Sequence, residues 1–316
     1  MDFSVSVIIP AYNCERFIEK AIRSALSQPE VYEVLVINDG STDQTLSISK
    51  KIEKSNQKVK ILYHKNGVNR GRSASRNLGV KRATGNFIAF LDADDYYLED
   101  RFLSDQKLFH LNPDADGAYN AVGFYFYRDA TEEERRTLTL NTVTQKIPPD
   151  VLFEALISGK YSHFHINGLT VKRSVFDRTG LFNEALVVAE DTDIFWKMAM
   201  TSRLETGVID KALAIRGVHE ENVFDRKDIY KGYTIKMYES LIYWSVTNGI
   251  SRKRIDTLLK WVWLLKYKEH SKLLVHIKYW GFLFFKDLRL LFSTLSIKYF
   301  PVVRLRQKLF PFLFKP

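Results

Sequence analysis

The sequence predicts an α/β fold with a mostly parallel sheet, because three apolar runs each end in polar residues. Residues 5–9 and 34–37 are rich in β-branched side chains, and residues 87–91 are uniformly apolar, as expected of buried strands. The first two runs each lead into a helical pattern, and this spacing predicts right-handed crossovers between parallel strands. The polar residues that follow the runs should therefore lie along one edge of the sheet, where α/β enzymes bind their ligands.

Two helices are predicted between these strands from start and stop signals. Asn13 is expected to cap a helix whose apolar face recurs through residues 17–26, and Pro29 follows its end. Ser41 and Gln44 have the spacing of a capping box, which predicts a second helix directly after them. Both helices would connect neighbouring strands and cover the sheet.

The most informative feature is the acidic run Asp92, Asp94 and Asp95, which follows the third apolar run. Carboxylates that lie close together repel one another and lose hydration when buried, so the run predicts a bound cation. Carboxylate oxygens favour Mg²⁺ or Mn²⁺, and either ion would carry a phosphorylated ligand. The alternative is that these residues form a solvated turn or cap a helix. Polar residues at the other strand ends favour the cation.

A second acidic cluster, Glu190, Asp191 and Asp193, precedes the apolar segment 194–198 and predicts the start of a helix. Acidic residues in a first turn also cap a helix and complement its dipole, which is the alternative to a catalytic role. His219 follows the last apolar run of this half of the chain. It is a candidate metal or phosphate contact, or an ordinary hydrogen-bonded surface residue.

These segments resemble the family 2 glycosyltransferases, which have the GT-A fold. The resemblance lies in residues 5–13, 38–43, 76–79 and 90–95, and it covers roughly the first 220 residues. It implies a catalytic domain over residues 1–225. Residues 1–110 would form its nucleotide-binding half and residues 111–225 its acceptor half. Residues 226–316 would form a basic, aromatic, helical appendage.

The resemblance also implies roles in binding the donor. Pro10, Tyr12 and Asp39 map onto positions that hold the nucleotide base. Tyr12 could stack on a pyrimidine or pack on the first helix, and Asp39 could accept the imide N–H of uracil or support a local turn. Among the arginines around Gly71, Arg72 is the candidate for the diphosphate, although a solvated arginine is the simpler interpretation.

Metal and catalytic roles follow from the same resemblance. Asp94 would ligate Mn²⁺ or Mg²⁺, Asp92 would contact the ribose or a metal-bound water, and His219 is a further candidate ligand. Asp191 would be the base of an inverting transferase, and Glu190 would orient it. His163 and His165 flank Phe164 in the expected acceptor region and are candidates to face the acceptor.

The implied function is transfer of a sugar from a nucleotide donor, preferably a UDP-sugar, to a saccharide or lipid-linked acceptor in cell-surface polysaccharide synthesis. One alternative is a nucleotidyltransferase that makes sugar nucleotides, but the sequence has no Gly-rich, basic loop near its start for a nucleoside triphosphate. The other is an inactive, membrane-bound assembly partner. The two acidic clusters argue against that alternative, because a domain released from catalysis has no reason to keep costly carboxylates.

The C-terminal segment carries the whole basic excess of the chain. Residues 251–316 contain 15 Lys and Arg against 3 Asp and Glu, a net charge of +12. An apolar stripe along this segment predicts an amphipathic helix on an anionic membrane surface. The alternative is that the stripe packs on the catalytic domain or on a second subunit, as in a homo-oligomer. Binding of nucleic acid is disfavoured, because the basic side chains are mixed with many large apolar ones. The stripe consists of Leu273, Ile277, Trp280, Phe284, Leu288, Leu291 and Leu295.

Cysteine content and the N-terminus predict a cytoplasmic location. Cys14 is the only cysteine, which fits a reducing compartment. The first strand begins within a few residues of Met1, which leaves no room for a signal peptide. No uncharged apolar run approaches the roughly 18–20 residues of a spanning helix, so peripheral attachment to the inner face of the plasma membrane is expected.

Overall fold

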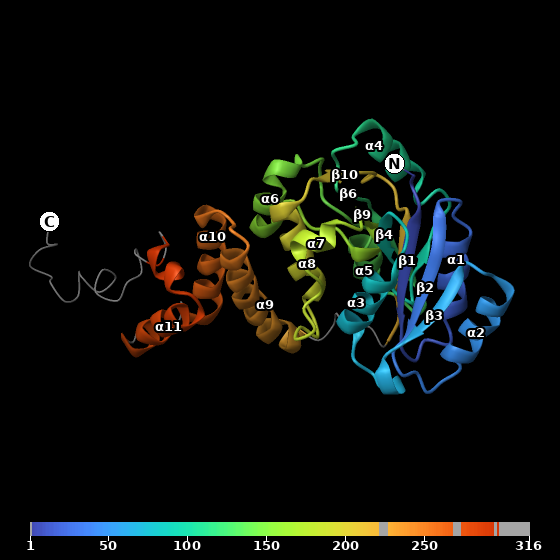
Figure 1. Cartoon of the computed structure of the whole chain (residues 1–316), viewed down its shortest axis with the longest axis horizontal. Coiled ribbons are helices and arrows are strands. Elements are labelled where there is room, and N and C mark those ends of the chain that lie inside the picture. The colour runs from blue at the N-terminus through green and yellow to red at the C-terminus, as the bar shows by residue number, and fades with distance from the viewer. Residues whose placement is uncertain (1, 221–226, 268–272, 294–295, 297–316) are drawn as a thin grey trace, which may run out of the picture. The chain divides into compact units, whose positions relative to one another are not determined.

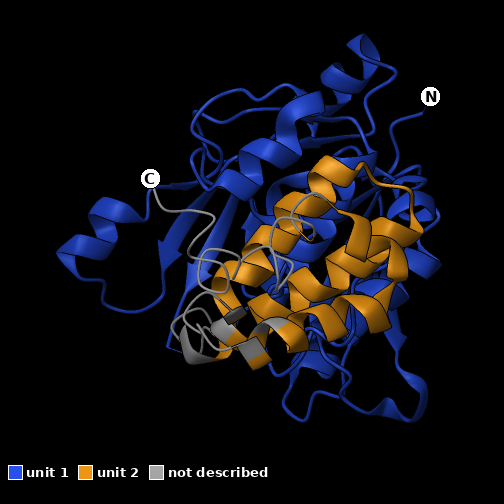
Figure 2. Cartoon of the chain, turned by 90° about the vertical axis from the view of Figure 1, so that its left-hand side faces the viewer, with its two compact units in different colours: residues 1–225 blue, residues 226–316 orange. Residues whose placement is uncertain are grey.

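The computed structural model describes residues 2–220, 227–267, 273–293 and 296. The chain divides into two compact units, residues 1–225 and 226–316, which Figure 2 shows in different colours. The strands lie in the first unit, and the described part of the second unit is helical.

A seven-stranded sheet forms the centre of the first unit (Figure 1). Its order is β10-β6-β9-β4-β1-β2-β3; β9 runs antiparallel to both neighbours, and the other pairs are parallel. The predicted α/β fold with a mostly parallel sheet is confirmed. The strands are β1 (Val5–Ala11), β2 (Val31–Asn38), β3 (Val59–Tyr63), β4 (Phe87–Phe90), β6 (Gly117–Tyr119), β9 (Leu169–Lys172) and β10 (Leu204–Thr206).

The order in which the chain adds strands to the sheet reverses at β1, since β2 and β3 lie on one side of it and β4 lies on the other. Strand β1 pairs with β2 on one side and with β4 on the other, both in parallel. Ala11 pairs with Asn38, and Ile8 pairs with Phe90, so the carboxyl ends of the three strands are neighbours. Open α/β sheets bind their ligands at such a switch point. The polar residues that follow these strands therefore gather at one edge, as their sequence positions predicted.

Helices cover both faces of this sheet (Figure 1). The helices α1 (Ile18–Leu26) and α2 (Thr45–Ser55) lie on one face, and α3 (Arg72–Arg82) packs on the other against β1. Gly79 lets α3 approach β1 closely, because a Cβ at this position would overlap the side chain of Ile8. Helix α3 consequently brings Arg76 close to Asp92, at the end of β4.

Both predicted helix starts are wrong by several residues. Asn13 has a φ of 46° and does not cap α1; its side chain instead accepts a hydrogen bond from the N–H of Thr42 at 2.8 Å. Ser41 forms no capping box either, because Asp43 accepts the Thr45 N–H at 3.0 Å at the start of α2. The polar residues after β1 and β2 thus bind each other. A capping box does occur at Thr131, which opens the exposed helix α5 (Glu132–Thr137).

The rest of the first unit adds a second, smaller sheet and several helices. The small sheet has the order β5-β11-β7-β8, and its strand β11 ends one residue before His219. Its strands are β5 (Tyr96–Tyr97), β7 (Val122–Phe126), β8 (Leu140–Asn141) and β11 (Ala214–Val218). The further helices are α4 (Leu103–Leu111), α6 (Leu152–Ser158), α7 (Val175–Thr179) and α8 (Glu190–Thr201), with 3₁₀ turns at Lys65–Gly67, Pro149–Val151 and Ile166–Gly168.

The second unit contains α9 (Lys227–Thr247), α10 (Arg252–Val262) with a π-helical turn at Trp263–Tyr267, and α11 (Leu273–Lys286). The prediction of one helix along the whole apolar stripe is wrong, because Asp287 ends α11 and accepts the Arg289 N–H at 2.8 Å. A 3₁₀ turn, Leu288–Phe292, follows, and Leu295 lies outside the described residues. Within the residues that the structure describes, no helix is both long and apolar enough to span a membrane.

Candidate active site

The acidic run forms a tight loop after β4, in which the Asp95 N–H donates to the Asp92 carbonyl at 3.0 Å. The side chains of Asp92 and Asp94 are 28% and 29% exposed. Asp95, in contrast, is buried. Two carboxylates of the run are therefore open to a ligand, and the third points into the protein.

Asp95 holds this loop to two distant segments. Its carboxylate accepts hydrogen bonds from the side-chain amide of Asn167 and, at 2.7 Å, from the Gly217 N–H. Burial and the neighbouring charges of Asp94 and Asp92 raise the pKa of Asp95 well above its usual range. Residue 217 has to be glycine for this approach, because a Cβ would lie 2.5 Å from the Asp94 carbonyl oxygen.

Asn167 is a site residue that the sequence did not reveal. Besides Asp95, it binds the Asp92 N–H through Oδ1 at 3.2 Å. Its carbonyl accepts hydrogen bonds from the buried Arg101, which also pairs with Asp105 at 2.9 Å. The acidic loop thus rests on a buried polar network. A lone Asn-Gly step before a strand is the sole local signal, and it reads equally well as a turn.

Asp94 and His219 come together as their sequence positions suggested. Asp94 Oδ2 lies 3.0 Å from His219 Nε2, and the imidazole stacks on Phe17 with ring centroids 5.0 Å apart. The packing on Phe17 limits where the His219 ring can move. A carboxylate oxygen and an imidazole nitrogen are both ligands of Mn²⁺.

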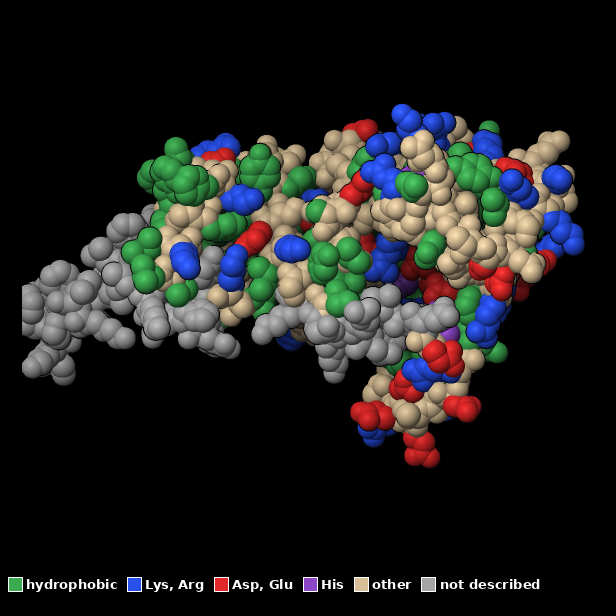
Figure 3. All heavy atoms as spheres, turned by 90° about the horizontal axis from the view of Figure 1, so that it is seen from below, with side chains coloured by type: hydrophobic (Ala, Val, Ile, Leu, Met, Phe, Trp, Pro, Cys, Tyr) green, Lys and Arg blue, Asp and Glu red, His purple; other side chains and the backbone are tan. Residues whose placement is uncertain are grey.

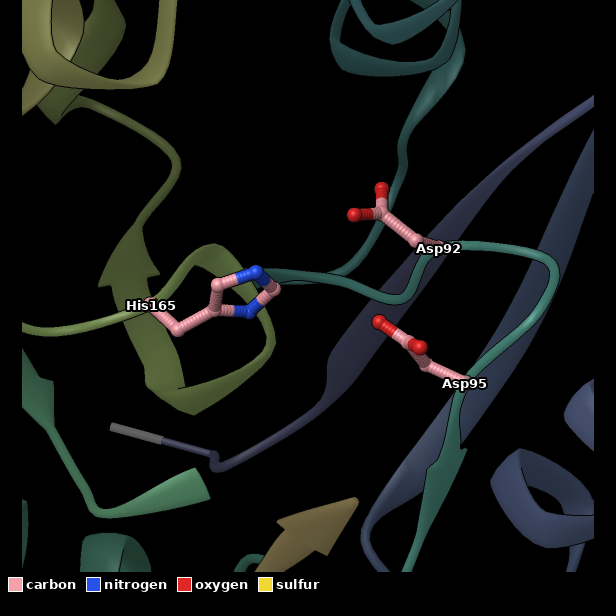
Figure 4. Close-up of side chains that lie close together, drawn as sticks. All are labelled: Asp92, Asp95 and His165. Atoms are coloured by element: carbon pink, nitrogen blue, oxygen red, sulfur yellow. The ribbon is translucent and has the colours of Figure 1, made fainter. Parts of the chain in front are cut away.

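A second group of ligand atoms lies beside the same loop. Atoms of Asp92, Asp95 and His165 lie within 4.8 Å of one another, and Figure 4 shows the three side chains turned toward a common point. Burial, together with the charge of Arg216, lowers the pKa of His165 to about 3, so its ring is neutral. Asp95 also accepts hydrogen bonds from the side-chain amide of Asn167 and the Gly217 N–H. The loop therefore offers two candidate groups of metal ligands, Asp94 with His219 and Asp92 with Asp95 and His165.

The nucleotide-base candidates lie at the ends of β1 and β2. Tyr12 follows β1 and is 52% exposed, whereas Pro10 lies within β1, in register with Ile37. Asp39 is buried, and its two oxygens accept the backbone N–H groups of Arg70 at 2.7 Å and of the following glycine at 2.8 Å. The structure therefore gives Asp39 a long-range role in fixing the loop before α3, in place of the local turn considered as an alternative.

The second acidic cluster forms the first turn of α8, as its position predicted. Glu190 is buried, whereas the side chain of Asp191 is 29% exposed. Both contact Arg76, whose Nη1 lies 2.6 Å from Asp191 Oδ1 and 3.3 Å from Glu190 Oε1. Arg72 pairs with Glu190 and donates to the Val187 carbonyl at 2.9 Å. In this structure Arg72 is thus directed toward the second cluster.

Arg76 also reaches the first cluster, because its Nη2 lies 2.7 Å from Asp92 Oδ1. Although burial opposes ionisation, the charge of Arg76 lowers the pKa of Asp92 to about 2. Burial and the charge of Asp191 raise the pKa of Glu190 to about 7 despite the neighbouring arginines. The two acidic clusters, far apart in the sequence, therefore form one electrostatically coupled site.

The fold and the site define a class: a GT-A domain with a carboxylate-rich site at its strand switch point. Residues 6–180 match the sequence model of glycosyl transferase family 2. This match covers more than half of the chain, and the chain belongs to that family.

Curated relatives agree with this family. The chain is 29% identical to a hyaluronan synthase of Pasteurella multocida over 236 residues, which are 71% of this chain and 21% of the synthase. It is also similar to WfaP of Escherichia coli, named as a UDP-Glc:alpha-D-GlcNAc-diphosphoundecaprenol beta-1,3-glucosyltransferase. The two are 26% identical over 78% of this chain and 94% of WfaP. The chain thus spans about a fifth of the synthase but nearly all of WfaP.

Solved structures share the fold. A TarS fragment (residues 1–349) from S. aureus, in complex with UDP, superposes with a TM-score of 0.62 at 19% identity over 96% of this chain and 91% of that one. The mannosyltransferase PcManGT of Pyrobaculum calidifontis, in complex with GDP-Man and Mn²⁺, gives a TM-score of 0.54 at 16% identity over 97% and 87%. At this identity the likeness establishes the GT-A architecture.

Proposed function

We propose that the protein is a metal-dependent, inverting glycosyltransferase that moves a sugar from a UDP-sugar to a hydroxyl of a saccharide or lipid-linked acceptor. The observation that carries the proposal is that two partly exposed carboxylates, those of Asp92 and Asp191, both contact the guanidinium of Arg76. A donor site and an acceptor base must lie side by side for transfer in a single step.

The donor nucleotide is assigned to the ends of β1 and β2. The exposed ring of Tyr12 offers a face for a uracil base. Each oxygen of Asp39 accepts one backbone hydrogen bond, and Oδ1 also lies 3.4 Å from His64 Nε2. Oδ2 is therefore the oxygen that can also receive the imide N–H of uracil. Cytosine lacks that donor, which makes the site selective for uracil.

The residues present fit a divalent cation. Asp94 would be its carboxylate ligand and His219 its nitrogen ligand, with Asp92 at the ribose or at a bound water. Bound there, Mn²⁺ or Mg²⁺ would stabilise the negative charge that develops on the departing diphosphate. Burial and the charges of Asp94 and Asp92 raise the pKa of Asp95, and a cation at this loop would offset the repulsion among the closely spaced carboxylates.

Asp191 is assigned as the general base. Its side chain is partly exposed and lies against Arg76, whereas Glu190 is buried and bridges Arg72 and Arg76. The acceptor oxygen attacks the anomeric carbon while the bond from that carbon to the diphosphate oxygen breaks, and the bonding pair leaves with UDP. The hydroxyl proton passes to the Asp191 carboxylate. Attack from the side opposite the leaving group inverts the configuration.

Calorimetric binding of UDP, with GDP and CDP as comparisons, tests the donor assignment. We expect Mn²⁺ to tighten UDP binding at least about tenfold, because the diphosphate completes the coordination of the ion. GDP and CDP should bind more weakly than UDP, since neither presents the uracil edge to Asp39. Equal binding of all three nucleotides would remove Asp39 and Tyr12 from base recognition, and UDP binding indifferent to metal would remove the cation.

We further propose that the second unit attaches to an anionic membrane surface through α11. Tyr279 and Leu283 are buried, whereas Phe284 and Phe285 are 52% and 86% exposed. Figure 3 shows hydrophobic and basic side chains interspersed on this unit. Anionic lipid complements this combination of charge and apolar surface. The other exposed apolar side chains of this region are Leu274, Ile277, Leu288 and Phe292, and the exposed cations are Lys278, Lys286 and Arg289.

Flotation with vesicles of phosphatidylglycerol and phosphatidylcholine tests this attachment. The wild-type protein should float with the vesicles, and Ile277→Ser combined with Phe285→Ser should largely remain in solution because the apolar contact is lost. Leu111→Ser, at a 77% exposed position of the first unit, is the matched control and should float normally. Undiminished flotation of the double variant would exclude α11 as the anchor. Concentration-dependent self-association that the double variant abolishes would assign the face to a second subunit.

A further inference from the structure

Arg76 occupies an unusual position for a charged side chain. It is fully buried, and its guanidinium contacts three carboxylates, those of Asp92, Glu190 and Asp191. The guanidinium also lies 5.4 Å from the centre of the Phe182 ring. Burying a guanidinium costs free energy unless its charge is compensated, and here the compensation comes from both acidic clusters.

Arg101 provides an internal comparison, because among the described residues it is the other large basic side chain that is fully buried. Arg101 pairs with one carboxylate, that of the buried Asp105, and otherwise binds a carbonyl and a hydroxyl. All of its partners are interior groups. Two of the carboxylates on Arg76 are instead 28% and 29% exposed, and they belong to the donor and acceptor sides of the proposed site. Structural support alone does not require that arrangement.

The chain before α8 is fastened to α3 beside Arg76. The side chain of Asn77 donates to the Phe182 carbonyl and accepts the Phe182 N–H, both at 2.9 Å. Arg70 pairs with Glu184 at 3.0 Å. These contacts hold the segment before α8 against α3 and against the loop that precedes α3. A movement of the Arg76 guanidinium toward one acidic cluster would therefore change its contacts with the other.

We propose that Arg76 is a positioning residue shared by the two halves of the reaction. Its Nη2 orients Asp92 on the donor side, and its Nη1 orients Asp191 on the acceptor side. This inference rests on the proposed function, since it assigns roles within that site. Donor binding changes the distribution of charge on the Arg76 guanidinium. The same guanidinium aligns Asp191, which is the base. The planar fork of arginine suits this task, whereas a lysine ammonium offers a single point of charge.

NMR of arginine side chains in the ¹⁵N-labelled wild-type protein tests the sharing directly. With the Arg76 Nη signals assigned through bonds, we expect them to shift when UDP and Mg²⁺ are added. They should also shift in the Asp191→Asn variant without ligand. Signals that respond to only one of these changes, while UDP and Mg²⁺ bind normally, would overturn the inference. Absence of UDP binding to the wild-type protein would instead remove the proposed function on which it depends.

Arg76→Lys adds a functional readout. Calorimetry with UDP and Mn²⁺ should show binding about tenfold weaker, and turnover of donor should fall about 100-fold at saturating donor, because small misplacements of a reacting group have effects of that size. If Arg76 had a merely structural role, Arg76→Lys would lower the amount of folded protein and leave the UDP affinity and the turnover of the folded fraction unchanged. That result would contradict the proposal. Arg82→Lys, at an exposed position in the last turn of α3, is the matched control. If Arg76→Lys does not fold, the wild-type NMR experiment decides.

Discussion

Asp191→Asn should abolish sugar transfer while leaving UDP binding nearly intact. A general base typically contributes 10²–10⁴ to the rate, so turnover should fall by about that factor. Asparagine has nearly the same shape as aspartate, and its side-chain oxygen can still accept the hydrogen bond that Asp191 Oδ1 now takes from Arg76. The substitution therefore removes the proton acceptor with little change to the shape of the site.

The measurement is initial-rate release of UDP, together with calorimetric binding of UDP in the presence of Mn²⁺. Asp177→Asn is the matched control, because Asp177 is an exposed acidic residue in the first turn of the neighbouring helix α7. It should retain full activity. A variant at position 191 with normal turnover would eliminate this residue as the base, and Glu190, whose pKa is raised to about 7, would become the next residue to test.

Asp94→Ala should remove the dependence of UDP binding on metal. The affinity for UDP in Mn²⁺ is expected to drop to that of the metal-free wild-type protein, and turnover should fall about 10²–10³-fold, as when one element of charge stabilisation is lost. The fold should remain intact, because Asp94 is partly exposed and its charge is one of the causes that raise the pKa of Asp95. Removing that charge relieves repulsion at a buried neighbour.

Thermal unfolding and calorimetry with and without Mn²⁺ check this result, with the exposed Asp114→Ala as the control. Two histidine variants separate the candidate ligand groups. If the ion is held by Asp94 and His219, His219→Ala should weaken metal-dependent binding and His165→Ala should affect it less. The opposite order would place the ion between Asp92, Asp95 and His165.

The strands and the acidic clusters were predictable because their signals are local. An apolar run such as residues 87–91 can only be buried, and the carboxylates after it are contiguous in the chain. The helix starts were mispredicted because Asn13 and Asp43 take part in contacts across two loops, and a propensity argument does not include such partners.

The role of Arg76 could not be predicted from the local sequence for the same reason. Its partners lie 16 to 115 residues away, and a buried arginine has the same sequence appearance as a solvated one on a helix. Asn167 is a similar case, because its contacts with the acidic loop join residues 75 and 72 positions apart. Polar groups that are satisfied by distant partners leave no periodic pattern in the sequence.

The contact between Gly217 and the acidic loop has a consequence for synthesis of the protein. The Gly217 N–H binds Asp95 across 122 positions of the chain, so the loop lacks one of its supports until strand β11 has been made and has paired with β7. A nascent chain that ends before residue 214 would contain every strand of the large sheet and still lack this support. Closing so long a loop is slow, and the ligand site should therefore mature last during folding.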